Sequence, residues 1–153
     1  MKKILTTLAL TTALVIPGSV MARTITLTGA LKNYGGDGAY LAVYVTKENG
    51  DFVGTVWVGG GKSKYFDHFT HWYRATRGDM RYAMTGASVG AGRSFEITFD
   101  LADALIDSGY QIRIDASVED MRDAPSDIVI PITSENFGVT NSGRRYVRSV
   151  VLQ

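Results

Sequence analysis

The sequence contains no cysteine among its 153 residues. Disulfide bonds, thiolate metal ligands, catalytic thiols and thioether-linked haem are therefore excluded. An excess of one charge is also missing, because 16 Lys and Arg stand against 15 Asp and Glu. A balanced chain lacks the basic surface that binds nucleic acid or an acidic membrane. We therefore expect no nucleic-acid partner.

Several familiar sequence patterns are absent as well. No internal repeat, low-complexity segment or Gly/Ser-rich linker divides the chain, so we expect one folded domain. The phosphate-binding G-x-x-x-x-G-K-[ST] and metalloprotease H-E-x-x-H patterns are missing. The adjacent acids Glu119 and Asp120 follow a predicted strand, where solvated carboxylates are common. We expect a protein that is not an enzyme.

Residues 1–22 have the features of a secretory signal peptide. Two lysines near the start precede an apolar run at residues 4–16, and a small-residue cleavage site ends at Ala22. The run is shorter than the about 20 apolar residues that span a bilayer. We predict cleavage after Ala22, a mature domain at residues 23–153, and a periplasmic location. Once processed, the chain would not be an integral membrane protein.

Hydrophobic residues alternate with a period of two through the mature chain, as half-buried strands require. Asn49-Gly50 supplies a hairpin turn between two of these segments. The pattern predicts an all-β domain: a single antiparallel β-sandwich of the immunoglobulin or fibronectin type. The seven predicted strands are residues 24–31, 40–46, 52–58, 93–100, 109–118, 128–133 and 145–152.

Helix and edge positions follow from smaller signals. One helical turn is predicted near residues 69–75, and residues 101–106 are a second, shorter helical candidate. Pro131 places its strand at a sheet edge or bulge, because its nitrogen cannot donate to a ladder. Arginines at 144, 145 and 148 interleave with apolar residues, so we expect the last strand to be a charge-protected edge.

The segment Thr85-Gly86-Ala87-Ser88 is the clearest candidate binding site. Its small residues flank two hydroxyl groups, so another molecule can approach the backbone closely. The alternative is a glycine-rich loop that only positions the next strand.

A set of short segments has a distinctive order along the chain: residues 40–45, 49–53, Trp57, Trp72, 85–88, 95–100 and 109–119. This order resembles the predicted periplasmic family called domain of unknown function 2271. The resemblance implies an exported β-sandwich with no assigned enzymatic activity. It also implies partners, because family members occur beside membrane PepSY-type proteins and a transferase that attaches FMN covalently to exported proteins.

The target of that transferase resembles D-x-x-T-G-A-T, with FMN joined through its phosphate to the last hydroxyl. Thr85, Gly86 and Ala87 match this motif, and Ser88 lies at the acceptor position. The leading Asp of the motif falls at Tyr82. The resemblance therefore implies a redox carrier with covalent FMN at Ser88, where serine forms the same phosphoester as threonine.

Other residues would have to surround such a flavin. Trp72, Tyr73 and Tyr82 are candidates to cover its ring, and Arg81 or Arg93 to neutralise its phosphate. The alternative for the aromatic residues is ordinary packing in the core or at its margin.

Two other functions remain open. His68 and His71 lie three residues apart beside Asp67, so a metal-binding module is the first alternative. Its remaining ligands would come from Asp79, Met80 and Met84. The second alternative is a structural or protein-interaction domain, in which residues 65–73 form an exposed aromatic patch.

Overall fold

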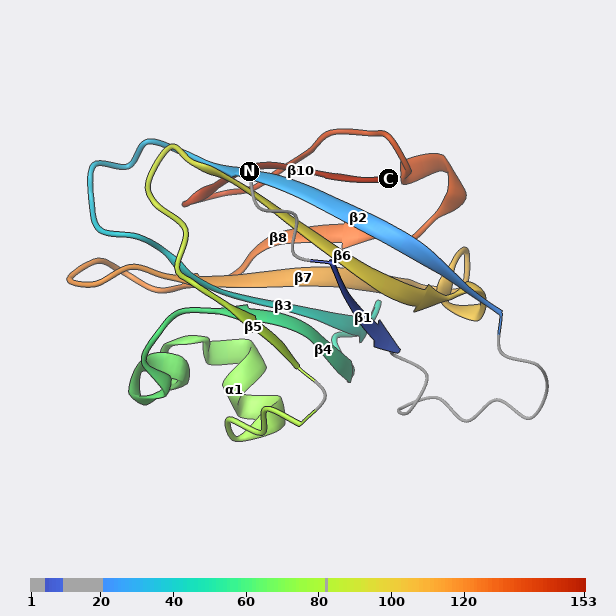
Figure 1. The fold of residues 1–153 in the computed structure, drawn as a ribbon, viewed down its shortest axis with the longest axis horizontal. Helices are drawn as coiled ribbons and strands as arrows, with labels where there is room; N and C mark the ends of the chain where they lie inside the picture. Colours follow the sequence, from blue (N-terminus) through green and yellow to red (C-terminus); the bar gives the residue numbers. More distant parts are fainter. Residues whose placement is uncertain (1–4, 10–20, 82) are drawn as a thin grey trace.

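Two β-sheets pack face to face in the protein (Figure 1). The computed structural model describes residues 5–9, 21–81 and 83–153. In this part of the chain the strand orders are β1-β6-β2-β10-β9 and β5-β4-β3-β7-β8. The first sheet contains β1 (Leu5–Ala9), β2 (Ala22–Leu31), β6 (Ser94–Ala102), β9 (Asn141–Ser142) and β10 (Val147–Leu152). The second contains β3 (Tyr40–Lys47), β4 (Phe52–Gly59), β5 (Met84–Gly86), β7 (Tyr110–Ser117) and β8 (Ala124–Pro131).

The predicted all-β sandwich is confirmed. All seven predicted strands are present, as β2, β3, β4, β6, β7, β8 and β10. Antiparallel pairs β2–β6 and β3–β7 form the centres of the two sheets. Strand β10, the last in the chain, pairs antiparallel with β2 on the side away from β6.

Strand β1 falls within the predicted signal peptide. It pairs in parallel with β6 at the edge of the first sheet, with Leu5 opposite Thr98. Residues 1–4 and 10–20 of the signal segment lie outside the described residues. Because β1 is an edge strand, its removal would leave the β2–β6 ladder intact, from Ala22 opposite Ala102 onward. Cleavage after Ala22 stays a prediction.

No helix in the described ranges is both long enough and apolar enough to cross a bilayer. The described helical elements are short: η2 (Ser63–His68), α1 (Thr70–Thr76), η3 (Asp103–Leu105) and η4 (Ser134–Asn136). The helical turn predicted near residues 69–75 is confirmed by α1. The second helical candidate, at residues 101–106, contributes only the single turn η3, because its first two residues still belong to β6.

The two edge predictions had different outcomes. Pro131 ends β8, which is the outer strand of the second sheet, so its edge position is confirmed. The last strand was predicted as an edge, and this is wrong. β10 lies between β2 and β9, because Asn141 and Ser142 pair with Val150 and Ser149.

Strand β3 is buried on both faces. Leu41, Val43 and Val45 point into the core between the sheets, whereas Ala42 and Tyr44 belong to a second apolar cluster on the outer face. Covering both faces makes the strand nearly continuously apolar, a pattern more usual in sheets with helices on them. The outer face of this sheet therefore needs a cover.

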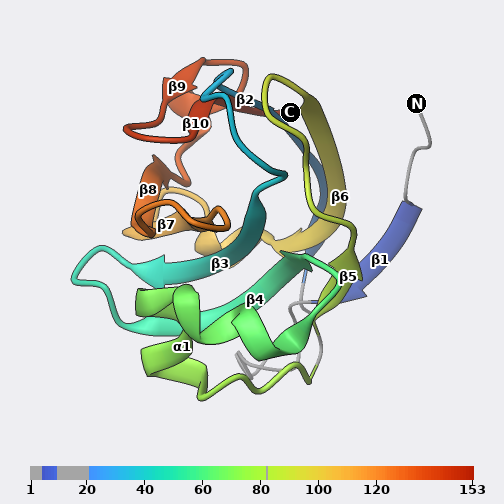
Figure 2. The same ribbon diagram turned by 90° about the vertical axis from the view of Figure 1, so that its left-hand side faces the viewer.

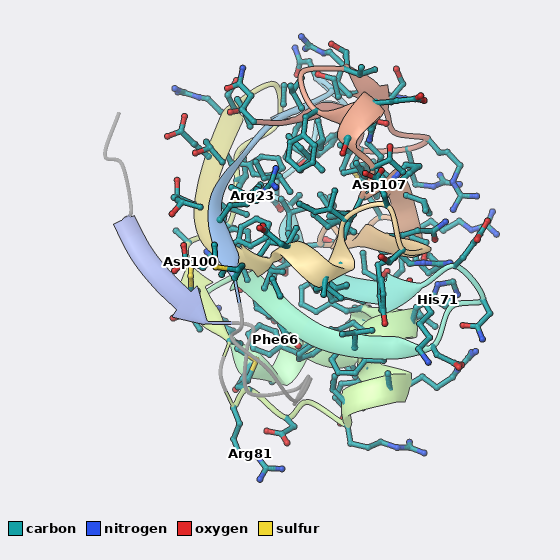
Figure 3. The ribbon with its side chains drawn as sticks, turned by 90° about the vertical axis from the view of Figure 1, so that its right-hand side faces the viewer. Arg23, Phe66, His71, Arg81, Asp100 and Asp107 are labelled. Carbon is teal, nitrogen blue, oxygen red and sulfur yellow. The ribbon has the colours of Figure 1, made fainter. Side chains whose placement is uncertain are left out.

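Elements η2 and α1 supply that cover, beneath β3 and β4 (Figure 2). Phe66, Phe69 and Trp72 point toward the sheet and pack in the outer cluster with Tyr44 and Val58. Figure 3 shows Phe66 in this position, between the strands and the helical layer. The aromatic segment 65–73 was considered as an exposed patch, and for these three buried side chains this is wrong.

A buried carboxylate fastens the helical layer to the sheet. Asp115 of β7 is fully buried. Its Oδ1 accepts hydrogen bonds from the Tyr44 hydroxyl at 2.8 Å and the Ser126 amide at 2.7 Å. Its Oδ2 accepts from the amides of His71 and Trp72 at 3.0 and 2.9 Å. These two amides open α1 and have no partner within the helix, so Asp115 satisfies them and its charge suits the helix N-terminus.

We expect Asp115→Asn to lower the free energy of unfolding by about 3 kcal/mol. The side-chain NH2 group of asparagine donates hydrogen bonds and would face other donors. At least two of the four hydrogen bonds would therefore be lost. Urea denaturation followed by tryptophan fluorescence measures the change, with exposed Asp67→Asn on η2 as the control. An Asp115→Asn midpoint equal to that of the control would contradict this role.

Two glycines make room for Trp57 in the core. A Cβ at Gly86 would lie 2.7 Å from the indole Cζ2 of Trp57, and one at Gly59 would lie 2.1 Å from Cη2. The indole stacks on Phe95, with ring centroids 6.5 Å apart and planes at 5°. Gly86 therefore has a packing role, independent of the motif that surrounds it.

Gly86→Ala should destabilise the protein by about 1–3 kcal/mol, because the added methyl group overpacks the core at a rigid indole ring. Gly61→Ala is the matched control, since a Cβ at Gly61 meets nothing within 4 Å. Thermal denaturation of both variants decides the point. Equal melting temperatures would show that the Trp57 contact does not constrain Gly86.

Candidate functional site

The predicted Thr85–Ser88 segment lies at the end of the second sheet. Thr85 and Gly86 belong to β5, which pairs in parallel with β4, so the expectation of a simple loop is wrong for these two residues. Ser88 is exposed, and its hydroxyl makes no hydrogen bond to any residue that the structure describes. Its Oγ would lie 3.1 Å from a Cβ placed at Gly38. Ser88 thus stands beside the chain that leads into β3.

Gly38 also lines a cavity of about 420 Å³, which we call the tyrosine pocket. Its wall combines residues before and at the start of β3, residues of the helical cover, and the connection between β7 and β8. Two tyrosines, Tyr40 and Tyr65, form part of this wall. The charged residues that line the pocket are Asp37, Lys62, His68, Glu119 and Asp120, with His68 charged only when protonated.

The two tyrosine rings are positioned by each other and by the helical cover. Tyr40 and Tyr65 meet edge to face, with centroids 6.0 Å apart and planes at 77°. Tyr40 also lies edge-on to Phe66, at 6.5 Å. Lys64 places its Nζ over the Tyr65 ring, 4.9 Å from the centroid. This distance is within the range of a cation–π contact.

A histidine on the same wall is oriented by a carboxylate. The His68 Nδ1 lies 3.0 Å from Oδ2 of Asp123, whose Oδ1 accepts a hydrogen bond from the Ser117 hydroxyl at 3.0 Å. In the neutral imidazole, donation from Nδ1 to the carboxylate leaves Nε2 as a hydrogen-bond acceptor. His68 and Ser117 both line the tyrosine pocket, so this polar chain forms one side of it.

One pattern in the Ser88 segment is missing from the sequence-based predictions. Residues 86–90 read G-A-S-V-G, which has the G-x-S-x-G spacing of a hydrolase nucleophile elbow. That elbow needs a strand–turn–helix, whereas the next described elements are the Ala39–Val89 bridge and strand β6. A hydrolytic serine also needs an adjacent base, and neither histidine is hydrogen-bonded to Ser88 in the described part of the chain. The surroundings of Ser88 therefore lack the context that gives this spacing its meaning.

The predicted metal ligands are not brought together. His68 pairs with Asp123, while the Nδ1 of His71 lies 2.8 Å from the Ser126 hydroxyl. Met84 is buried between the sheets, and Met80 packs on the outer cluster. Within the described ranges, no three His, Cys, Asp or Glu side chains gather closely enough to hold a metal ion.

The residues predicted to surround a flavin are also scattered. Trp72 is fully buried and donates its indole N–H to Thr55 at 2.9 Å, so it cannot cover a ligand ring at Ser88. Tyr82 lies outside the described residues. Arg81 forms an ion pair with Asp79 and extends away from the body of the protein (Figure 3). The aromatic ring that lies against this segment is that of Trp57, which packs at Gly86 in the core.

The ion pair of Asp79 has a measurable electrostatic consequence. Hydrogen bonds from the Arg81 side chain and amide hold the pKa of the Asp79 carboxyl below its usual value. This acid is thus already occupied, although it is the nearest carboxylate before the Thr85–Ser88 segment. It does not take the place of the motif's missing aspartate at Tyr82.

Comparison with known proteins gives one match, to a family. No curated protein and no solved structure matches the chain. The match covers residues 22–149, which is most of the chain and begins at the first residue of β2. The resemblance seen in the sequence is thereby confirmed, and the chain belongs to the family described as predicted periplasmic protein (DUF2271).

Proposed function

We propose that this chain is an exported accessory domain, without catalytic activity of its own, whose Ser88 carries covalently attached FMN. The observation that supports this is the exposed Ser88 hydroxyl, which has no hydrogen-bond partner among the described residues. A modifying enzyme can reach such a hydroxyl without unfolding the domain. The inferred partners are a flavin transferase and a membrane redox protein, for instance of the PepSY type.

The backbone around Ser88 leaves its hydroxyl accessible to a modifying enzyme. The neighbouring Gly38 has no side chain to obstruct the hydroxyl, whereas a Cβ at that position would lie 3.1 Å from the Ser88 Oγ. When attached, the flavin would supply one- or two-electron transfer between partners, while the protein holds it in place.

The modification can be written as a balanced group transfer. The Ser88 oxygen forms a new P–O bond to the flavin mononucleotidyl group of a flavin dinucleotide. The phosphoanhydride bond of that donor breaks, a nucleoside monophosphate leaves, and the hydroxyl proton is released. The role of this chain is to present the oxygen, and that of the transferase is to activate the phosphorus.

Co-expression with a flavin transferase should raise the intact mass of the periplasmic protein by that of FMN less one water. Ser88→Ala should abolish the increase, and Ser88→Thr should keep it, because threonine forms the same phosphoester. Exposed Ser94→Ala lies outside the motif and serves as the control. An unmodified wild-type mass in the presence of active transferase and flavin would rule out the proposal.

The missing acid of the motif offers a second test. Tyr82→Asp restores D-x-x-T-G-A in the sequence, so the modified fraction should rise at a fixed transferase concentration. Fluorescence of the denatured protein band, calibrated by intact mass, measures this fraction. A fraction unchanged by Tyr82→Asp would mean that recognition does not use this position.

A further inference from the structure

We propose that the tyrosine pocket binds a small organic cation, with an ammonium group held by carboxylates and an apolar part packed on the tyrosines. This goes beyond the proposed function and does not require FMN on Ser88. The pocket is assembled from segments distant in the sequence, and it has a volume of about 420 Å³. A ligand with several carbon atoms as well as its charged group fits that space.

The charges around the pocket select a cation. Asp37, Glu119 and Asp120 line it, against Lys62 alone among its described lysines and arginines. None of these three carboxylates makes a side-chain hydrogen bond or ion pair with another described residue. His68 lies against the carboxylate of Asp123, with Nδ1 3.0 Å from Oδ2, so a positive charge on its ring would be offset by that acid. A positively charged ligand therefore meets uncompensated negative charge.

The aromatic wall favours an organic cation over a bare metal ion. Tyrosine rings attract ammonium groups, as the Lys64 ammonium 4.9 Å from the Tyr65 centroid shows, and Tyr40 and Tyr65 both line the pocket. The carboxylates surround the cavity without converging, since no group of three in the described residues can hold a metal ion. A cation with a larger body reaches the acids and the rings at once.

A matched pair of probe ligands isolates the contribution of the ligand's positive charge to binding. 2-Phenylethylamine is cationic at neutral pH, whereas 2-phenylethanol has nearly the same shape and no charge. We expect calorimetric titration of the purified full chain to show binding of the amine at least about tenfold tighter than the alcohol. Backbone NMR shifts on adding the amine should centre on Tyr40, Tyr65 and Glu119. Equal binding of the two probes, or no saturable binding of the amine, would overturn the proposal.

Variants identify the site. Glu119→Gln with Asp120→Asn should weaken amine binding about tenfold and leave alcohol binding unchanged. Asp67→Asn is the matched control, because Asp67 is an exposed acid beside His68 that does not line the pocket. It should bind the amine as the wild type does. Unchanged amine affinity in the Glu119/Asp120 double variant, with its fold intact by circular dichroism, would contradict the assignment.

A last variant separates this proposal from the flavin. Ser88→Ala should keep its full affinity for the amine while losing any covalent flavin. Loss of amine binding in Ser88→Ala would show that the amine depends on the serine rather than on the carboxylates and tyrosines, and would overturn the pocket as drawn. The flavin proposal is judged independently, by intact mass.

Discussion

The buried carboxylate of Asp115 is the contact on which the candidate site depends. It accepts four hydrogen bonds from groups on β3, β8 and α1, and it satisfies the opening amides of α1. A buried charge is costly unless it is fully hydrogen-bonded, so the loss of any one of these contacts would weaken the attachment of α1 to the sheet. Burial, followed by the nearby Asp115 charge, raises the pKa of Tyr44 far above its usual value, which keeps that hydroxyl a donor at any physiological pH.

Attachment of the helical layer has consequences beyond stability. Elements η2 and α1 bury the outer face of the second sheet, and η2 carries Tyr65 and His68 to the wall of the tyrosine pocket. Ser126 of β8, the strand beside β7, also takes part and has a φ of 44°, a left-handed conformation that non-glycine residues rarely adopt. Its amide donates to Asp115 and its hydroxyl contacts His71. A strained residue at this junction is consistent with a contact that the fold maintains against local preference.

A second buried carboxylate, on β8 of the second sheet, acts in the same way on the chain that leads into β10 of the first sheet. Asp127 accepts hydrogen bonds from four successive amides, those of residues 144–147. It thereby fixes the turn that leads into β10, the strand that pairs with β2. Without disulfides, the domain relies on such carboxylate–amide contacts, along with its apolar core, to hold the ends of its strands.

The strands could be predicted from the sequence because alternation reports directly on which side of a pleat is buried. The helical cover was harder to place, because Phe66, Phe69 and Trp72 look the same in a sequence whether they face a sheet or solvent. Edge positions failed for β10, whose two-residue neighbour β9 is too short to leave a pattern. The Gly86 requirement also escaped prediction, since it comes from the distant Trp57 ring.

The two parts of the candidate site also differ in how well the sequence predicts them. The Thr85–Ser88 segment is continuous in the chain, so the sequence alone can find it. The tyrosine pocket brings together three separate segments, none of which carries a recognisable motif: Asp37 with Tyr40, then Tyr65, then Glu119. Only their meeting in three dimensions makes them a candidate site.

Amide hydrogen exchange at His71 and Trp72 tests the role of Asp115 most directly. In the wild-type protein, both amides should exchange as slowly as the amides at the centre of β7. The reason is that neither amide is released from Asp115 until the helical layer leaves the sheet. Rapid exchange at these two positions, with β7 still protected, would show that the carboxylate does not hold the helix and that the pocket wall it positions is not part of the stable fold.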